Sequence, residues 1–249
     1  MNHELRFGRF TSSRIGELMK IDKRKKVKEY SPLEDNSYIE EKRMEIRLGR
    51  QLEVEGGSRA LSWGHIGERF VFQNHLNTEY RLCSDETLIH PDYSFWAGSP
   101  DGFRFIDETI VFDVKCPFTL TSFCNLVDGG TIEDVRENHK EGDMYYWQLV
   151  SNAILYEAIN KTKITRAELI VFCPYESELG QLTALSSTID DADLQNKLAW
   201  LNWAKKEEMP YLIDGGFYKN LNIISFEITD EDKEELIKRV KEAGELLYA

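Results

Sequence analysis

Two short stretches of the sequence carry residues suited to metal chemistry. Asp101 lies in the turn Gly98-Ser99-Pro100-Asp101-Gly102, and the run Asp113-Val114-Lys115-Cys116-Pro117 follows it closely. Asp113 and Lys115 are two residues apart at the end of a predicted strand, so their side chains leave the same face. Two carboxylates beside an ammonium group favour a hard cation such as Mg²⁺ or Mn²⁺ over zinc, because these cations prefer oxygen ligands.

Each fragment alone has an ordinary explanation, since Asp-x-Lys on a strand is usually a solvated surface pair and Pro-Asp-Gly is usually a plain turn. The surroundings of Asp113 and Lys115 raise the odds of function. The two charges interrupt the apolar run Ile110-Val111-Phe112, and a strand covered on both faces does not carry charge without cause. Cys116-Pro117 then ends the strand, which predicts that the pair lies at a rim of the sheet.

The elements that position these residues follow from the hydrophobic pattern. We predict a short helix capped by Thr11 or Ser12, then helices over about 33–55, 63–76, 143–159, 190–206 and 229–247. Consecutive strands of a meander are predicted over 87–90, 95–97, 103–106 and 109–115, with Asp107-Glu108 as the last hairpin turn. A buried strand over 166–173 and an edge strand over 223–228 complete an α/β (α+β) chain with a mixed β-sheet flanked by helices.

Composition excludes several classes of protein. The chain has 249 residues, of which 41% are hydrophobic, so whole-chain disorder is excluded. The net charge of -13 excludes a uniformly basic nucleic-acid-coating protein but leaves room for a local basic face, with Arg6, Arg9, Arg14 and the lysine-rich run 23–28 as candidates. No stretch is long and apolar enough for a membrane span, and no signal peptide is recognised. Four cysteines without a C-x-x-C pair favour a reduced, cytoplasmic setting.

Ser-Pro-Asp-Gly followed by Asp-Val-Lys-Cys-Pro resembles the PD-(D/E)XK nuclease motif, and more narrowly that of the phage lambda exonuclease (YqaJ-type viral recombinase) family. Three further segments resemble the family in the same order. Trp63-Gly64-His65-Ile66-Gly67-Glu68 is similar to its upstream helix, and Tyr146-Trp147-Gln148-Leu149 to its glutamine-bearing helix. The segment from Arg6 to Ser13 is similar to the family's DNA-contacting Arg…Gly…Thr-x-Ser pattern. The resemblance covers roughly residues 4–175.

The resemblance implies a restriction-endonuclease-like fold and a single nuclease domain over 1–249, in which 176–249 is a C-terminal extension packed on the core. It implies that Mg²⁺, or Mn²⁺ as a substitute, is bound by Asp101, Asp113, the Val114 carbonyl and Glu68. Lys115 would polarise the attacking water or stabilise phosphate charge, and Gln148 would orient the water or the lysine. Without the resemblance, the sequence predicts that Glu68 is a solvated residue on a helix and that Gln148 is a hydrogen-bonded amide at the edge of the core.

Phosphate or DNA binding is assigned to Arg6, Thr11, Ser13, Arg14 and Ser99, although Thr11 and Ser13 are read equally well as helix caps. One departure concerns Asp113, because the lambda enzyme has a glutamate there and the shorter side chain changes the geometry. No iron–sulfur cluster is expected, since the cysteines do not follow the spacing of cluster-bearing nucleases. Their positions are Cys83, Cys116, Cys124 and Cys173.

The predicted function is a Mg²⁺-dependent 5′-to-3′ exonuclease that degrades linear double-stranded DNA in phage-type recombination in the cytoplasm of a bacterial host. A single-strand annealing protein and a homotrimer are the partners that the resemblance implies. Two alternatives stay open: a nuclease for single-stranded or flapped DNA, and a catalytically silent DNA-binding or assembly module. Retention of Asp101, Asp113 and Lys115 argues against the silent module.

Overall fold

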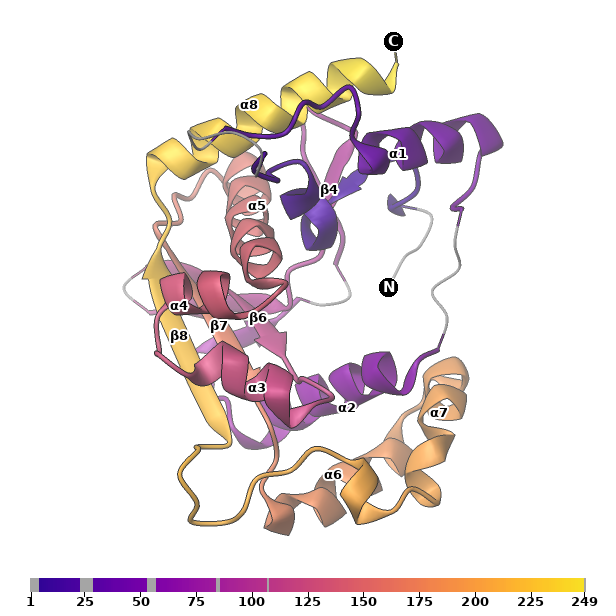
Figure 1. Ribbon diagram of the computed structural model, residues 1–249, viewed down its shortest axis with the longest axis vertical. Coiled ribbons are helices and arrows are strands. Elements are labelled where there is room, and N and C mark those ends of the chain that lie inside the picture. Colours follow the sequence, from indigo (N-terminus) through magenta and orange to yellow (C-terminus); the bar gives the residue numbers. More distant parts are fainter. Residues whose placement is uncertain (1–4, 23–28, 53–56, 84–85, 107, 249) are drawn as a thin grey trace.

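The computed structural model describes residues 5–22, 29–52, 57–83, 86–106 and 108–248, and contains two β-sheets with helices around them (Figure 1). The larger sheet has the order β2-β5-β6-β7-β8. Its strands are β2 (Tyr80–Leu82), β5 (Gly102–Phe105), β6 (Thr109–Lys115), β7 (Arg166–Phe172) and β8 (Leu221–Glu227). Strands β6 and β7 are parallel and the other pairs are antiparallel, which confirms the predicted mixed sheet.

A smaller sheet holds the N-terminal segment beside the turn that contains Asp101. It has the order β1-β4-β3, with β1 (Phe10–Thr11), β3 (Leu88–Ile89) and β4 (Trp96–Gly98). Strand β1 runs parallel to β4, and β3 runs antiparallel to it. The N-terminal residues therefore lie next to a segment that is more than 80 residues away in the sequence.

Helices cover both faces of the larger sheet. The long helix α5 (Gly142–Asn160) packs on the face that carries Val111 and Leu169, and α2 (Arg59–Asn74) on the face that carries Phe112 and Ile170. Because β6 and β7 are covered on both sides, their sequences are almost continuously apolar. The remaining helices are α1 (Ser37–Leu48), α3 (Leu120–Val127), α4 (Ile132–Asn138), α6 (Leu179–Leu185), α7 (Ala192–Leu198) and α8 (Asp230–Leu247).

Several sequence predictions need correction. The helix expected over 33–55 ends at Leu48, because Gly49 takes a left-handed conformation with φ 68° and terminates it. The strands expected as one meander belong to two different sheets, since β4 pairs with β1 rather than with β5. The segment 190–206 forms α7 followed by short 3₁₀ turns. Strand β2 and helices α3, α4 and α6 were not predicted.

Other expectations agree more closely with the structure. Helix α5 matches the prediction within one residue at each end, and the Thr229 side chain caps α8 by accepting from the Asp232 amide. The first helix is a 3₁₀ helix over Ser12–Glu17, and among the described residues its Thr11 side chain makes no capping hydrogen bond. Asp107, half of the predicted hairpin turn, lies outside the described residues, although β5 and β6 do form the hairpin.

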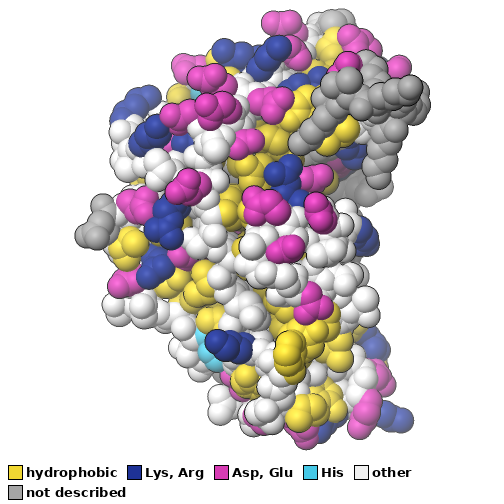
Figure 2. All heavy atoms as spheres, turned by 60° about the vertical axis from the view of Figure 1, so that its left-hand side comes forward, with side chains coloured by type: hydrophobic (Ala, Val, Ile, Leu, Met, Phe, Trp, Pro, Cys, Tyr) yellow, Lys and Arg dark blue, Asp and Glu magenta, His cyan; other side chains and the backbone are white. Residues whose placement is uncertain are grey.

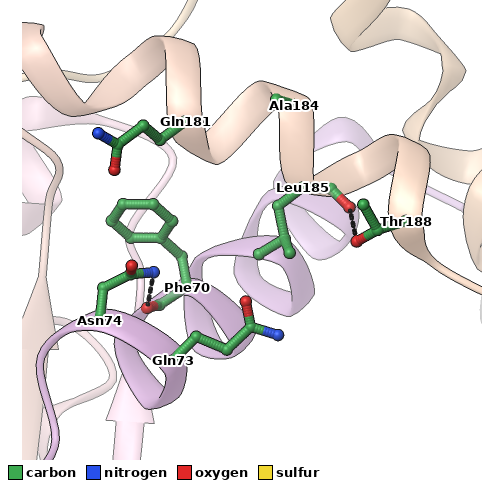
Figure 3. A pocket seen from close by; sticks show the side chains of 7 residues that line it. All are labelled: Phe70, Gln73, Asn74, Gln181, Ala184, Leu185 and Thr188. Atoms are coloured by element: carbon green, nitrogen blue, oxygen red, sulfur yellow. Dashed lines mark hydrogen bonds between the residues drawn. The ribbon is translucent and has the colours of Figure 1, made fainter.

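A small pocket lies between α2 and α6, away from the predicted site. Its volume is about 220 Å³. Figure 3 shows Phe70, Gln73 and Asn74 of α2 facing Gln181 and Leu185 of α6 across it. None of the site residues predicted from the sequence lines it.

On the molecular surface, Figure 2 shows acidic and basic side chains interspersed over the upper part of one face. Within the described part of the chain, no helix is long and apolar enough to cross a membrane.

Candidate active site

The β5–β6 hairpin places Asp101 beside the end of β6. Gly102 pairs with Phe112, so Asp101, one residue earlier, lies opposite Asp113. The Asp101 carboxylate accepts a 2.7 Å hydrogen bond from the Val114 amide. Gly102 is needed at this turn, because a Cβ there would lie 2.2 Å from the backbone oxygen of Arg81. The Pro-Asp-Gly turn therefore fixes one carboxylate against the strand that carries the other.

Asp113 and Lys115 point to the face of β6 that α5 covers, and Gln148 of α5 bridges them. The Lys115 Nζ lies 2.6 Å from Asp113 Oδ2. The Gln148 amide nitrogen donates to Asp113 Oδ1 at 2.6 Å, and its amide oxygen accepts from Lys115 Nζ at 3.3 Å. Asp113 is only 1% exposed, whereas the Lys115 side chain is 22% exposed. The ammonium thus stands at the rim of the sheet, in reach of solvent, as the sequence predicts.

The charges at this cluster shift two pKa values. Burial alone lowers the pKa of Lys115, but the neighbouring carboxylates of Asp113 and Asp101 outweigh it and raise that pKa overall. Burial also raises the pKa of Asp101 well above its usual value, and the negative charges of Asp113 and Glu68 add to the effect. Lys115 therefore stays an ammonium ion at neutral pH, while the carboxylates repel one another. Such an arrangement attracts a further cation.

Glu68 approaches the cluster from α2, on the other face of the sheet. The preceding residue, Gly67, lets α2 pack tightly against the segment after β6, since a Cβ at Gly67 would lie 2.7 Å from Cys116 Sγ. Besides acting on Asp101, the Glu68 charge contributes, after burial, to the raised pKa of the Cys116 thiol. The structure therefore brings Glu68 within electrostatic range of both Asp101 and Cys116.

The donor set agrees with a hard cation in its chemistry. Asp101, Asp113 and Glu68 offer carboxylate oxygens, the ligands that Mg²⁺ and Mn²⁺ prefer. Asp113 Oδ2 is buried, and the Lys115 ammonium lies 2.6 Å from it. No three Asp, Glu, His or Cys side chains in the described ranges stand close enough together to hold a metal ion in the present arrangement.

The residues predicted to bind phosphate lie around β1 and the end of β4. Arg6 Nη2 donates to Ser13 Oγ, which also lies 3.3 Å from Thr11 Oγ1. Strand β1 runs parallel to β4, and the residues that follow the paired positions also lie close together. A Cβ at Gly98 would lie only 2.1 Å from Ser12 Oγ. Ser99 follows Gly98, and its hydroxyl lies 3.1 Å from Thr87 Oγ1. The hydroxyl-rich segment and the chain leading to Asp101 are therefore adjacent.

Arg14 makes different contacts from Arg6. Its guanidinium lies 2.6 Å from Glu17 and 2.6 Å from Glu41, and 4.3 Å from the centre of the Tyr38 ring. Burial lowers the pKa of Arg14, but the hydrogen bonds to Glu41 and Glu17 raise it overall. Arg14 thus connects the 3₁₀ helix to α1 through Glu41, whereas Arg6 contacts the hydroxyl of Ser13. The predicted lysine-rich run 23–28 lies outside the described residues.

No protein-family model and no characterised sequence matches the chain, but solved structures do. An alkaline exonuclease from Laribacter hongkongensis matches with a TM-score of 0.54 at 16% identity, over 99% of this chain and 91% of that one. Its complex with dAMP gives 0.53 over the same shares. A phage-related exonuclease from Haemophilus somnus 129PT gives 0.55 at 14% identity, over 96% and 93%.

The chain has the fold of these exonucleases. The resemblance drawn from separated sequence motifs is thereby confirmed at the level of fold, over nearly the whole chain rather than only its first 175 residues. At such low identity the likeness concerns the fold alone.

Within the exonuclease fold, sequence reasoning missed two side chains beside the site. Tyr145 lies three residues before Gln148 on α5, and its ring centre is 4.7 Å from Lys115 Nζ. The helical spacing from Gln148 is a signal that points to it, because residues three apart share a helix face. Thr87, the partner of Ser99, has no such signal, since the contact crosses from β3 to β4 and depends on the pairing of the smaller sheet.

Proposed function

We propose that this protein is a Mg²⁺-dependent deoxyribonuclease, an exonuclease that degrades linear double-stranded DNA from the 5′ end. The observation that carries the proposal is the cluster of Asp101, Asp113 and Lys115, bridged by Gln148 at the rim of the sheet. The fold shared with an alkaline exonuclease, one structure of which contains dAMP, and with a phage-related exonuclease supports it.

Mg²⁺, with Mn²⁺ as a substitute, would be held by Asp101, Asp113, the Val114 carbonyl and Glu68. When bound, such an ion activates water for attack on a phosphodiester and neutralises charge in the transition state. Asp113 now pairs with Lys115, so it would have to serve the ammonium and the ion together. Burial, followed by the negative charges of Asp113 and Glu68, raises the pKa of Asp101, and a bound cation would favour the ionised form of this carboxyl.

Lys115 acts as a cation in this proposal. Its pKa is raised, so it has no free electron pair with which to accept a proton at neutral pH. It donates instead, either to the attacking water or to a phosphate oxygen, and stabilises the charge that develops there. Gln148 restrains the geometry, because its amide binds Asp113 and Lys115 at the same time.

The predicted phosphate-binding residues around β1 and the end of β4 supply the preference for a 5′ end. Arg6, Thr11, Ser13 and Ser99 offer a guanidinium and three hydroxyls, which match the oxygens of a terminal phosphate. Ser99 is two residues before Asp101, so a phosphate held there lies close to the proposed cleavage site. The homotrimer and the single-strand annealing partner stay predictions from the sequence resemblance.

The test uses linear duplex DNA labelled separately at its 5′ and 3′ ends, with Mg²⁺ or with EDTA. We expect nucleotides to be released first from the 5′ ends, and this release to be lost in EDTA and in Lys115→Ala. Lys238→Ala, an exposed lysine on α8, is the matched control and keeps wild-type activity.

Other outcomes decide against the proposal. Release from 3′ ends contradicts the polarity, and cleavage confined to single strands or flaps replaces the substrate. DNA binding with no cleavage under any divalent metal makes the chain a binding module.

A further inference from the structure

Tyr145 makes a contact with Lys115 that the proposed chemistry has not used. It lies in the first turns of α5, half-buried, and its ring centre is 4.7 Å from the Lys115 ammonium. The face of an aromatic ring attracts a cation. Lys115 therefore contacts residues on two elements: Asp113 on its own strand, and Gln148 and Tyr145 on α5.

The ring of Tyr145 is itself held in place. Its hydroxyl donates to the Glu141 carboxylate at 2.8 Å, and its ring stacks against His139 with centres 5.4 Å apart. Burial, with the Glu141 carboxylate, raises the pKa of the Tyr145 hydroxyl, so it stays a donor. The tyrosine thus cannot follow Lys115 freely if the lysine changes its conformation.

His139 is fixed in turn by α3 and by the start of α5. The Glu141 amide donates to His139 Nδ1 at 3.2 Å, so in the neutral ring Nε2 carries the proton and donates to Ser122 Oγ at 2.8 Å. Burial lowers the pKa of His139, which keeps the imidazole neutral. A neutral ring adds no positive charge near the ammonium of Lys115.

We propose that Tyr145 is a positioning residue for Lys115: its ring, held by Glu141 and His139, keeps the ammonium against Asp113 and Gln148 at the rim of the site. A lysine side chain has four rotatable bonds, and fixing them has an entropic cost that the ring contact offsets. This inference rests on the proposed nuclease function for its kinetic consequence, but the contact itself does not depend on activity.

Three variants test the kinetic part. Tyr145→Leu removes the ring and is expected to lower kcat about tenfold, with KM for DNA unchanged, because the lysine loses the cation–π contact that holds it in place. Tyr145→Phe keeps the ring and is expected to restore most of kcat. Tyr156→Leu is the matched control on the same helix, since Tyr156 packs on Phe103 instead, and it keeps wild-type kcat.

A second measurement is independent of catalysis. With lysine labelled at its ε-carbon, the ε-methylene signals of Lys115 are identified by NMR from their loss in Lys115→Ala. A ring current from Tyr145 is expected to shift them upfield in the wild type and in Tyr145→Phe, and Tyr145→Leu is expected to move them toward the positions of exposed lysines.

Unmoved Lys115 signals in Tyr145→Leu, or wild-type kcat in that variant, overturn the inference. If the wild-type protein cuts no DNA, the proposed function fails, and the NMR signals still decide whether Tyr145 holds Lys115.

Discussion

Gln148 contacts both members of the Lys115–Asp113 ion pair. Because its side chain is neutral, replacing it removes these contacts without changing the charge of the site. Gln148→Leu deletes two hydrogen bonds to charged groups, each worth about 1.5–3 kcal/mol. We expect the rate of cleavage at saturating DNA to fall about 10²- to 10⁴-fold, while DNA affinity changes little, since each 1.36 kcal/mol is a factor of about ten in rate. Single-turnover kinetics measure this, with the exposed Gln181→Leu as control. An unchanged rate in Gln148→Leu would remove Gln148 from the site.

Asp101 is the residue at which stability and function oppose each other. Its folded-state pKa is raised, so its ionised form destabilises the metal-free protein at pH values above that pKa, and the penalty disappears as pH falls through it. Asp101→Asn is therefore expected to raise the melting temperature in EDTA at pH values above that pKa, and its advantage over the wild type to shrink as the pH is lowered through it.

The same Asp101 variant also reports on the metal. Mg²⁺ is expected to raise the melting temperature of the wild type, because a ligand that binds only the folded state stabilises it, and to have little effect on Asp101→Asn. Asp35→Asn, at an exposed carboxyl, shows neither the pH-dependent gain nor the loss of Mg²⁺ response. Equal Mg²⁺ responses in all three proteins would place any bound ion elsewhere.

At the scale of elements, the distance between α2 and β6 depends on Gly67. A methyl group at this position meets Cys116 Sγ at 2.7 Å, so Gly67→Ala moves the helix or the strand end and shifts Glu68 with it. A misplacement of about 1 Å lowers catalytic rates by as much as about 100-fold. We expect a marked loss of nuclease activity in this variant with the fold retained by circular dichroism.

Gly64 on the same helix supplies the control for Gly67. Apart from Gly64 itself, its two chain neighbours and the nearby backbone of its own helix, no atom of a described residue lies within 4 Å of the place its Cβ would take. Gly64→Ala is therefore expected to keep full activity and to gain as much as about 1 kcal/mol in stability from the better helix propensity of alanine. Equal activity in Gly64→Ala and Gly67→Ala would show that tight packing at Gly67 does not position the site.

Elements with a local signal were predictable, and those that depend on distant pairing were not. Helix α5 and strands β6 and β7 were found because their apolar patterns are long and continuous. Strand β2 is short and largely exposed, so its sequence has no buried face to reveal it. The pairing of β1 with β4 joins two segments far apart in the chain, and no local pattern encodes it.

In the candidate site, too, some residues have a local sequence signal and others do not. Asp101, Asp113 and Lys115 were placed by turn and strand spacing alone, and the structure brings them together. Gln148 and Glu68 required the family resemblance, because an amide or a glutamate on a helix has no distinctive spacing. Arg14 was predicted to contact DNA from its charge; in the structure its guanidinium pairs with Glu17 and Glu41, and the sequence does not reveal these ion pairs.

For the whole molecule, the net charge of -13 must be reconciled with DNA binding. At physiological salt, screening limits long-range repulsion to about 8 Å, so a few local cations determine affinity. Each phosphate contact contributes about 0.9 to the slope of log affinity against log salt concentration. We expect Arg6→Ala to reduce this slope by about 0.9, and Arg14→Ala, already paired with two glutamates, to leave it unchanged. Equal slopes in the two variants would exclude Arg6 as a phosphate contact.

Strand β8 and helix α8 contribute side chains to the main hydrophobic core. Strand β8 pairs with β7 along its whole length, and α8 buries Leu236, Val240, Ala243 and Leu247. The buried Lys233 also binds Glu157 and the Ile164 carbonyl, both at 2.6 Å. Figure 1 shows β8 at one edge of the sheet and α8 running beside α1 and across the end of α5.

Deleting residues 220–249 is therefore expected to abolish cooperative unfolding. Burial of each large apolar side chain contributes about 1.5–3 kcal/mol, and several are lost together, against a total stability of about 5–15 kcal/mol. Thermal melting followed by circular dichroism measures this, and deletion of residues 248–249, where Tyr248 is exposed, serves as control with a nearly unchanged melt. A fragment 1–219 that melts cooperatively and cuts DNA would instead make β8 and α8 accessory, and the sheet would then have to tolerate β7 as an exposed edge.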